Sequence, residues 1–256
     1  MSDQSLASPL FAPGNFHYLP GVFQYSAGVA AADGYRLERA RFDRPVPLAE
    51  AFGRVRAHLA ARNRPTEAFC ACELRSPAPF TEAGFLAFNR EYAGTLDAWG
   101  LLVLGDNPVA RSNVCPAANP PAEPSMHAFC YTMPASPAGP REFVIAGSGE
   151  AEEGAATWEE AIVARGDTSP GGIARKAGYV VGEMERRLAG FGRAWADCSA
   201  VQLYTVYDAY PVIAGEVARR RAWGDGLAWH WCRPPVVGID FEMDCRRVGA
   251  ELLLEG

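Results

Sequence analysis

The feature that most constrains the fold of this chain is an internal duplication. The segment Phe23–Gly34 (FQYSAGVAAADG) has the pattern of an apolar strand followed by a corner of small residues and a glycine turn. The segment Phe143–Gly154 (FVIAGSGEAEEG), 120 residues later, has the same pattern. Two further blocks recur in the same order, at offsets of 129 and 124 residues: Leu59-Ala60, Arg64, Ala71 and Leu74 with Leu188-Ala189, Arg193, Ala200 and Leu203, and Ala98-Trp99-Gly100 with Ala222-Trp223-Gly224. Three collinear blocks predict two copies of one unit, which we place at residues 1–133 and 134–256.

Hydrophobic periodicity gives both halves the same order of elements. In the first half we predict strands at 22–30 and 36–42, a helix at 48–62, a strand at 67–75, a helix at 82–98 and strands at 108–115 and 126–132. In the second half we predict strands at 142–148 and 158–164, a helix at 171–190, a strand at 197–206, a helix at 209–222 and strands at 227–232 and 238–245. A Pro- and Gly-rich segment at 133–141 reads as the linker. This order predicts an α+β fold of two tandem domains, each a mixed β-sheet with two helices packed on one face.

Composition excludes several classes of protein. Of the 256 residues 49% are hydrophobic, which excludes a disordered chain, and a net charge of −6 with a pI of about 5.3 excludes a basic nucleic-acid binder. The seven cysteines form no CxxC pair and the four histidines stand at no ligand spacing from them, so we expect neither a disulfide framework nor a metal site. Residues 1–15 do not resemble a signal peptide, and no apolar run reaches 18 residues. We therefore expect a cytoplasmic protein without a membrane or nucleic-acid partner.

Four short motifs and the element order resemble one superfamily. The motifs are Asn107–Val114 (NPVARSNV), similar to a Pro-Ala-Arg-Ser/Thr-x-Val strand; Phe241–Asp244 (FEMD), similar to a terminal Val-Glu-Ile-Glu strand; Phe143–Gly149, similar to a first strand ending in Ser-Gly; and Gly166–Thr168, similar to a Gly-Asp turn before a helix. Together they resemble the RidA/YjgF superfamily, which has a chorismate-mutase-like α+β fold and typically forms trimers with sites between subunits. Among its two-domain members, the chain is most similar to the 2-amino-5-chloromuconate deaminases and more distantly to the chorismatases.

The resemblance implies roles for two residues. Arg111 matches the arginine that binds the substrate carboxylate, and Glu242 matches the glutamate that orders the attacking water. Each half departs from the full pattern, because the first half has His127 where the glutamate is expected and the second has 226–228 (GLA) where the arginine is expected. Either one site is assembled across the halves, or one half has become a scaffold.

These two residue types suit the hydrolysis of an enamine carboxylate, the reaction that the resemblance implies. A guanidinium binds a carboxylate through two parallel hydrogen bonds, and a carboxyl group within reach orients water and transfers a proton. The alternative for Arg111 is a surface salt bridge. The alternative for Glu242 is a strand residue that faces solvent, since it alternates with Phe241 and Met243.

Five further residues are candidates for the site, although fewer sequence features point to them. A substrate with two carboxylates needs a second cation, for which Arg75 and then Arg233 are the candidates, each with the alternative of a solvated loop arginine. His127 stands in an apolar strand and is either a core histidine or an acid–base group. Ser26 and Ser148 end the first strand of each half and are candidate polar contacts.

The resemblance implies a metal-independent hydrolytic deaminase that needs no cofactor. It would act on an enamine or imine carboxylate, for instance 2-aminomuconate or a chlorinated analogue, and release ammonia. Two alternatives stay open: a chorismatase-like hydrolase, whose relatives are longer chains, and a non-catalytic ligand-binding protein. The expected partners are a small carboxylate substrate and further copies of the chain, with a trimer favoured by the habit of the superfamily.

Overall fold

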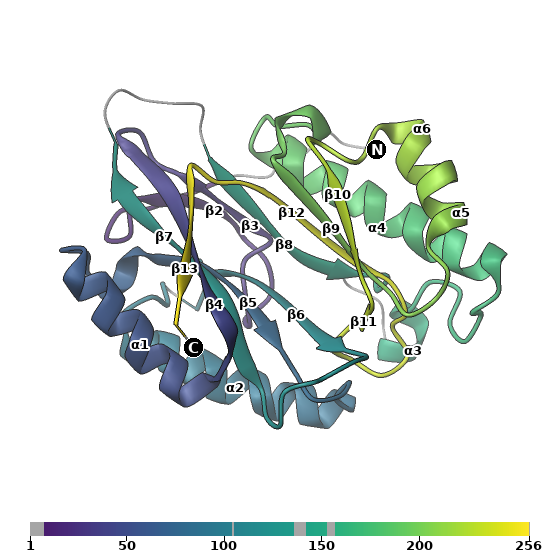
Figure 1. Ribbon diagram of the computed structural model, residues 1–256, viewed down its shortest axis with the longest axis horizontal. Coiled ribbons are helices and arrows are strands. Elements are labelled where there is room, and N and C mark those ends of the chain that lie inside the picture. The colour runs from purple at the N-terminus through teal and green to yellow at the C-terminus, as the bar shows by residue number, and fades with distance from the viewer. Residues whose placement is uncertain (1–7, 104, 136–141, 153–156, 256) are drawn as a thin grey trace.

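The computed structural model describes residues 8–103, 105–135, 142–152 and 157–255. Within these residues the strands form two mixed sheets that stand side by side, with helices on their outer flanks (Figure 1). The predicted α+β architecture is thereby confirmed. Residues 136–141 of the predicted linker lie outside the described residues. None of the described helices has the length and apolar character needed to cross a lipid bilayer.

The six-stranded sheet carries the first two helices. Its strand order is β11-β6-β5-β7-β4-β13, with bounds Cys232–Arg233, Ala110–Pro116, Phe69–Arg75, Ser125–Pro134, Tyr35–Pro47 and Ala250–Leu254. The β5·β6 and β13·β4 pairs are parallel and the others antiparallel. Helices α1 (Leu48–Ala61) and α2 (Glu82–Ala98) cover it, because α1 buries Phe52, Val55 and Leu59 on one face.

The seven-stranded sheet carries the later helices. Its order is β1-β2-β3-β8-β12-β9-β10, with bounds Leu10–Phe11, Phe16–Leu19, Gly28–Ala31, Phe143–Gly149, Glu242–Arg247, Ala200–Tyr204 and Leu227–His230. Helix α4 (Pro170–Gly190) packs on β8 and β12, and begins where the Ser169 hydroxyl accepts a hydrogen bond from the backbone of Gly172. The predicted 209–222 helix is α5 (Tyr210–Val212), a π turn (Ile213–Val217) and α6 (Ala218–Arg220) in succession.

The two halves exchange strands. Strands β1 to β3 come from the first half and lie in the sheet of the second, whereas β11 and β13 come from the second half and lie in the sheet of the first. The division between the sheets therefore does not coincide with the predicted division at residue 133. This exchange ties both sheets into one unit and brings residues of both halves together.

Three sequence predictions of local structure were wrong or incomplete. The predicted strand at 158–164 is instead a short helix, α3 (Trp158–Ala161), because the Thr157 hydroxyl accepts from the backbone of Glu160 and starts a helical turn. The strand predicted at 22–30 begins only at Gly28, because the side chain of Asn107 binds the carbonyls of Phe23 and Gln24 and holds that segment as a turn. Strands β1, β2 and β13 were not predicted.

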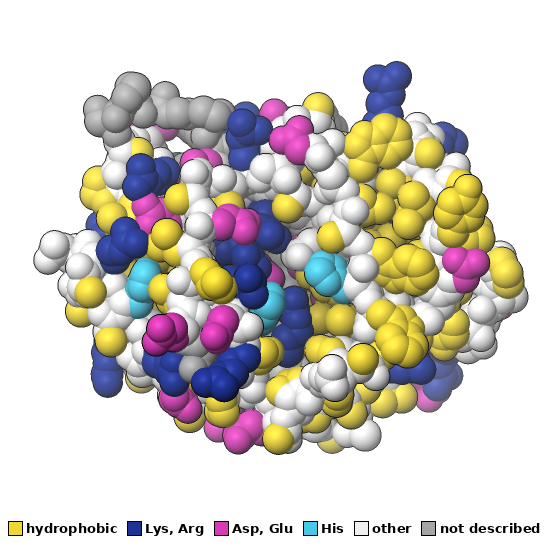
Figure 2. Space-filling view, viewed as in Figure 1, with side chains coloured by type: hydrophobic (Ala, Val, Ile, Leu, Met, Phe, Trp, Pro, Cys, Tyr) yellow, Lys and Arg dark blue, Asp and Glu magenta, His cyan; other side chains and the backbone are white. Residues whose placement is uncertain are grey.

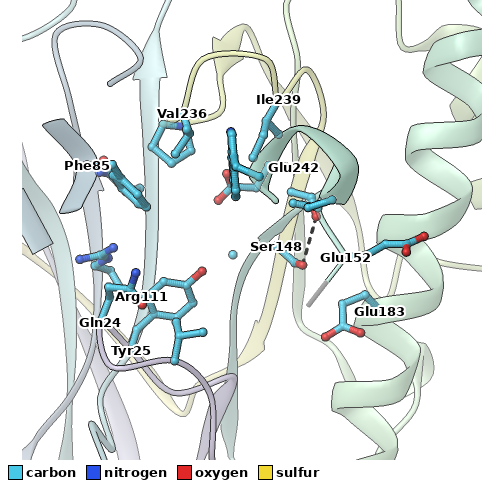
Figure 3. Close-up of a pocket in the computed structure, with 18 of the residues that line it drawn as sticks. Gln24, Tyr25, Phe85, Arg111, Ser148, Glu152, Glu183, Val236, Ile239 and Glu242 are labelled. Atoms are coloured by element: carbon cyan, nitrogen blue, oxygen red, sulfur yellow. Dashed lines mark hydrogen bonds between the residues drawn. The ribbon is translucent and has the colours of Figure 1, made fainter. Parts of the chain in front are cut away.

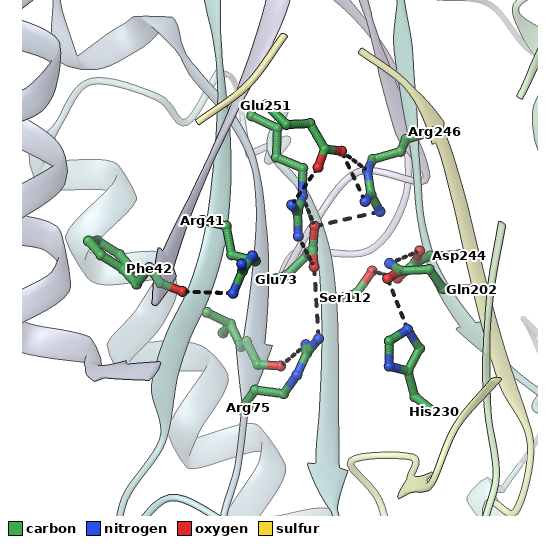
Figure 4. Close-up of polar contacts among 12 residues, drawn as sticks. Arg41, Phe42, Glu73, Arg75, Ser112, Gln202, His230, Asp244, Arg246 and Glu251 are labelled. Atoms are coloured by element: carbon green, nitrogen blue, oxygen red, sulfur yellow. Dashed lines mark hydrogen bonds and ion pairs between the residues drawn. The ribbon is translucent and has the colours of Figure 1, made fainter. Parts of the chain in front are cut away.

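A seam of buried polar side chains joins the inner faces of the sheets (Figure 4). At its centre the Asp244 carboxylate accepts hydrogen bonds from Ser112 Oγ at 2.7 Å, Gln202 Nε2 at 2.8 Å and the Tyr204 hydroxyl at 2.9 Å. Figure 2 shows where this seam reaches the surface, with arginine and histidine side chains gathered around a hollow between the sheets. Since these polar groups bind one another, the seam fixes the relative position of the two sheets.

Candidate active site

A pocket of about 450 Å³ lies where β6 and α2 of the first half meet β8, α3, α4 and the start of β12 in the second. Arg111, Ser148 and Glu242, three of the residues predicted from the sequence, lie in its wall (Figure 3). The first of these comes from the first half and the other two from the second. These three predicted residues are thus brought together across the two halves of one chain.

Arg111 is a buried cation without an anionic partner. Its side chain is on β6, with a relative exposure of 3%, and its NH2 atom donates to Asn89 Oδ1 at 2.8 Å. Its NH1 atom has no hydrogen-bond partner, and no ion pair to Arg111 is present among the residues described. The alternative of a surface salt bridge is therefore excluded. A desolvated guanidinium with an unused donor is poised to bind a carboxylate.

Aromatic rings surround the Arg111 guanidinium. The ring centroids lie at 4.7, 5.0, 5.6 and 5.7 Å from its central carbon and belong, in that order, to Tyr92, Tyr25, Phe88 and Phe85. These faces attract the cation and shield it from water. The turn that holds Tyr25 is fixed by the Asn107 amide, and by Ser26, whose hydroxyl donates to the Pro108 carbonyl at 3.0 Å. Ser26 thus lies outside the pocket wall and supports the turn.

Glu242 is a buried carboxyl group on the opposite side. Its relative exposure is 4%, so the alternative of a solvent-facing strand residue is wrong. Burial, and then the nearby charges of Asp244 and Glu150, raise the pKa of Glu242 well above its ordinary value, against the opposing effect of Arg111 and Arg187. The folded chain therefore keeps this carboxyl in its neutral form to a higher pH than an exposed glutamate. A neutral carboxyl group beside a substrate is a proton donor.

The space for the Glu242 carboxyl depends on Gly147. A Cβ atom at this position would collide with Glu242 Oε1 and would approach the Cα of Ser112 to 3.2 Å. Gly147 lies on β8, next to the strand that carries Glu242. Only glycine therefore leaves room for the carboxyl group between the two sheets.

A buried ion pair fixes the entry to β12. The Glu150 carboxylate accepts from the backbone N–H groups of Asp240 at 2.6 Å and Phe241 at 2.9 Å, directly before Glu242. Lys176, the only lysine of the chain, donates to Glu150 at 3.0 Å and to Asp240 at 3.1 Å from a fully buried position on α4. These contacts place the Glu242 backbone and were not predicted from the sequence.

A second arginine in the pocket, Arg187, was also not predicted. It lies on α4 and donates to Glu183 Oε1 at 2.6 Å, to the Ala146 carbonyl at 3.2 Å and to Ser148 Oγ at 3.4 Å. The sequence did contain a signal, because Arg187 follows Met184 by three residues on the apolar face of the helix. A charged residue on a buried helical face is a candidate for a polar site.

The other predicted site residues lie elsewhere. Arg75 is buried in the seam, where it donates to the Leu74 carbonyl at 2.9 Å and lies over the Tyr204 ring. His127 is next to it, and burial, then the charge of Arg75, lowers the pKa of this histidine to about 3, which keeps it neutral. Arg233 is exposed on β11. None of these three side chains lines the pocket with Arg111 and Glu242.

The comparisons with known proteins agree with the resemblance found in the sequence. A protein of Comamonas testosteroni named 2-amino-5-chloromuconate deaminase is 50% identical over 246 residues, which cover 96% of this chain and 98% of that protein. Among solved structures, a chorismatase matches with a TM-score of 0.48 and 11% identity over 89% of this chain and 78% of that one. The YjgF gene product of E. coli matches with a TM-score of 0.32 and 13% identity over 42% and 80%. The family model described as "2-aminomuconate deaminase CnbZ" matches residues 9–252, so the chain belongs to this family of deaminases.

Proposed function

We propose that the chain hydrolyses 2-aminomuconate or a chlorinated analogue, releasing ammonia, at the pocket between the two sheets. The family and the 50% identical relative support the reaction and the substrate class. The observation that carries the proposed site is the pairing, in one pocket, of a buried arginine without an anionic partner and a buried carboxyl group with a raised pKa. Such a pair suits an anionic substrate that must gain a proton.

Arg111 binds the carboxylate next to the amino-bearing carbon in this proposal. Its NH1 donor is unused in the absence of substrate, and the Asn89 amide holds the guanidinium plane. Binding replaces an uncompensated buried charge by an ion pair in a water-poor, aromatic surrounding, where electrostatic attraction is strong. The attacked carbon is thereby held in a fixed position relative to Glu242.

Glu242 transfers the protons. Its neutral carboxyl group protonates the enamine carbon, which gives an iminium with an electrophilic C2 atom, and the resulting carboxylate then takes a proton from the attacking water. A C–O bond forms at C2 and the proton passes to the nitrogen. The C–N bond then breaks as the hydroxyl group of the adduct gives its proton to the Glu242 carboxylate, so ammonia leaves, the 2-oxo acid remains and Glu242 is neutral again. The balance is enamine plus water to oxo acid plus ammonia, without a redox step.

Replacement of Arg111 by alanine tests the site. We expect ammonia release from 2-aminomuconate, generated in situ, to fall at least ~100-fold in kcat/KM, about 2.7 kcal/mol of transition-state binding. Arg233→Ala is the matched control, because this arginine is exposed and outside the pocket, and its activity should stay within twofold of wild type, about 0.4 kcal/mol. Equal losses in both variants would reject the assignment, and no release by the wild-type chain would reject the reaction.

We also propose that the chain acts in the cytoplasm as a homo-oligomer, with a trimer favoured. All seven cysteines are free and buried thiols, as suits a reducing compartment. Large apolar side chains are exposed at and beside the edge strand β10, among them Trp229 and Trp231, and such patches favour contact with another protein surface. Light scattering of the purified chain tests the assembly, and a mass of 27.6 kDa would reject it.

A further inference from the structure

Unsatisfied polar atoms are concentrated in the candidate pocket. Four buried side-chain atoms of its wall have no hydrogen-bond partner in the part of the chain that the structure describes: Gln24 Oε1, Arg111 NH1, Asn113 Nδ2 and Trp158 Nε1. Folded proteins contain few such atoms, because each one loses its bonds to water without replacement. Four in one pocket indicate contact points for a ligand. Three of them donate and one accepts, so the ligand must supply mainly acceptor oxygens.

Two of the donors come from different halves of the chain. Arg111 is on β6 of the six-stranded sheet, whereas Trp158 begins α3, which follows β8 of the seven-stranded sheet. Figure 3 shows Arg111 and Phe85 on one side of the pocket and Ser148, Glu152 and Glu183 on the other. The β-bridge between Ala151 and Ile162 ties the segment that holds α3 to this second side. A ligand that satisfies both donors must therefore carry acceptor oxygens at two separated positions. The indole N–H can only donate a hydrogen bond, so its partner must be an oxygen or nitrogen atom with a free lone pair.

The charges on the second-half side of the pocket permit an anion there. The Glu183 carboxylate is paired with Arg186 at 2.6 Å and Arg187 at 2.6 Å. The Glu152 side chain is exposed, so water screens its charge. The charge of Glu183 is thus offset where it reaches the pocket wall, so the second-half side of the pocket can accept an anion.

We propose that the Trp158 indole N–H binds the second carboxylate of the substrate and thereby selects dicarboxylates over monocarboxylates. The inference rests on the proposed function, which places the first carboxylate on Arg111. A volume of about 450 Å³ accommodates a six-carbon dicarboxylate that spans the pocket. In this arrangement the neutral Glu242 faces the carbon atoms of the substrate that lie between its two carboxylates. Trp158 is a specificity-determining residue and takes no part in proton transfer.

A matched pair of ligands tests the proposal without turnover. The trans,trans isomers of muconate and sorbate share a six-carbon diene with one carboxylate, and differ in the group at the far end, a carboxylate in muconate and a methyl in sorbate. Calorimetric titration should show that the wild-type chain binds muconate more tightly. Trp158→Phe keeps an aromatic ring but removes the N–H, so it should weaken muconate binding by about 10- to 100-fold and leave sorbate binding unchanged, as loss of one hydrogen bond to a charged group predicts.

Two further variants complete the design. Arg111→Ala should weaken both ligands, because both carry the first carboxylate. Trp223→Phe is the matched tryptophan control, since Trp223 is partly exposed and outside the pocket, and it should change neither affinity. The proposal is overturned if the wild-type chain does not prefer muconate, or if Trp158→Phe weakens both ligands equally or neither.

The outcome is separable from that of the proposed function. A chain that discriminates muconate from sorbate through Trp158, but releases no ammonia from 2-aminomuconate, would retain the dicarboxylate site and lose the proposed reaction. A chain that releases ammonia while Trp158→Phe leaves muconate binding unchanged would retain the reaction and overturn the role of Trp158.

Discussion

The pocket and the seam both bury charged side chains between the two sheets, yet they treat these charges in opposite ways. In the seam, Glu73 accepts from Arg39 Nε at 2.6 Å and NH2 at 2.9 Å, and lies within 3.9 Å of Arg75 and Arg246. The exposed Glu251 adds pairs to Arg39 and Arg246. Each of these buried charges has a partner. The seam can therefore hold the sheets together without a ligand.

In the pocket two buried groups, Arg111 and Glu242, are left without an ionic partner. Arg111 has an unused donor, and the carboxyl of Glu242 has no hydrogen-bond donor or cation bound to it among the described residues. This arrangement stabilises the fold less than a paired one would, because both groups lose their contacts with water and gain no ionic partner in exchange. A folded chain that tolerates such groups in one pocket gains by binding a molecule that completes them. The difference indicates that the seam serves structure and the pocket serves function.

Removal of the central carboxylate of the seam should have the largest effect on stability. Glu73→Gln leaves three buried arginines with one anion fewer, and we expect a loss of about 3–5 kcal/mol in the free energy of unfolding. Urea denaturation measures it. The control is Glu50→Gln, which breaks the exposed Glu50–Arg54 pair on α1 and should change the free energy by less than about 1 kcal/mol.

Activity completes this test of the comparison. The folded fraction of Glu73→Gln should deaminate 2-aminomuconate at a rate within a few-fold of wild type, because Glu73 is outside the pocket. A variant that loses activity at unchanged stability would show that the seam, and not the pocket, carries the function.

The sequence predicted the repeated core well because periodicity dominates there. Helices α1, α2 and α4 match their predicted ranges within a few residues, since each buries one apolar stripe. The short helix at Trp158–Ala161 was missed because one side-chain cap decided it, at Thr157, in a segment without clear periodicity. Hydrophobic periodicity cannot predict an element whose formation depends on a single side-chain hydrogen bond.

The site was predicted in part for a related reason. Arg111 and Glu242 were found because their neighbours carry motifs, whereas Arg75 was proposed only as a second cation and His127 only because it stands where the first half should carry the glutamate. The equivalence of His127 fails at a bulge: Glu73 pairs with Ala128 and Leu74 with Met126, so His127 is the extra residue of β7. A bulge changes which face a side chain points to, and nothing in the sequence marks it. Arg187 had a signal in its place on the apolar face of its helix, whereas the role of Lys176 became apparent only from the packing of α4.

The smallest expected effect separates the two regions by the sign of their pH dependence. Although burial acts to raise it, the charges of Arg39, Arg246 and Arg75 bring the pKa of Glu73 well below its ordinary value. The folded chain thus binds fewer protons there than the unfolded chain, so the stability from Glu73 is present above the ordinary glutamate pKa and is lost progressively as the pH falls from that value toward the lowered pKa. The pKa of Glu242 is raised, so its effect is the reverse: stability is full below the ordinary pKa and declines as the pH rises toward the raised value.

Urea denaturation from about pH 3 to 9 measures both limbs, each with a slope of at most about 1.4 kcal/mol per pH unit and proton. We expect Glu242→Gln to flatten the decline of the free energy of unfolding toward higher pH, because an amide has no proton to lose. We expect Glu73→Gln to flatten the rise of this free energy from low pH. The exposed Glu50→Gln should change neither slope. If Glu242→Gln instead flattened the acid limb, its carboxyl would be ionised in the folded chain, and the proton donor proposed for the reaction would have to be sought elsewhere in the pocket.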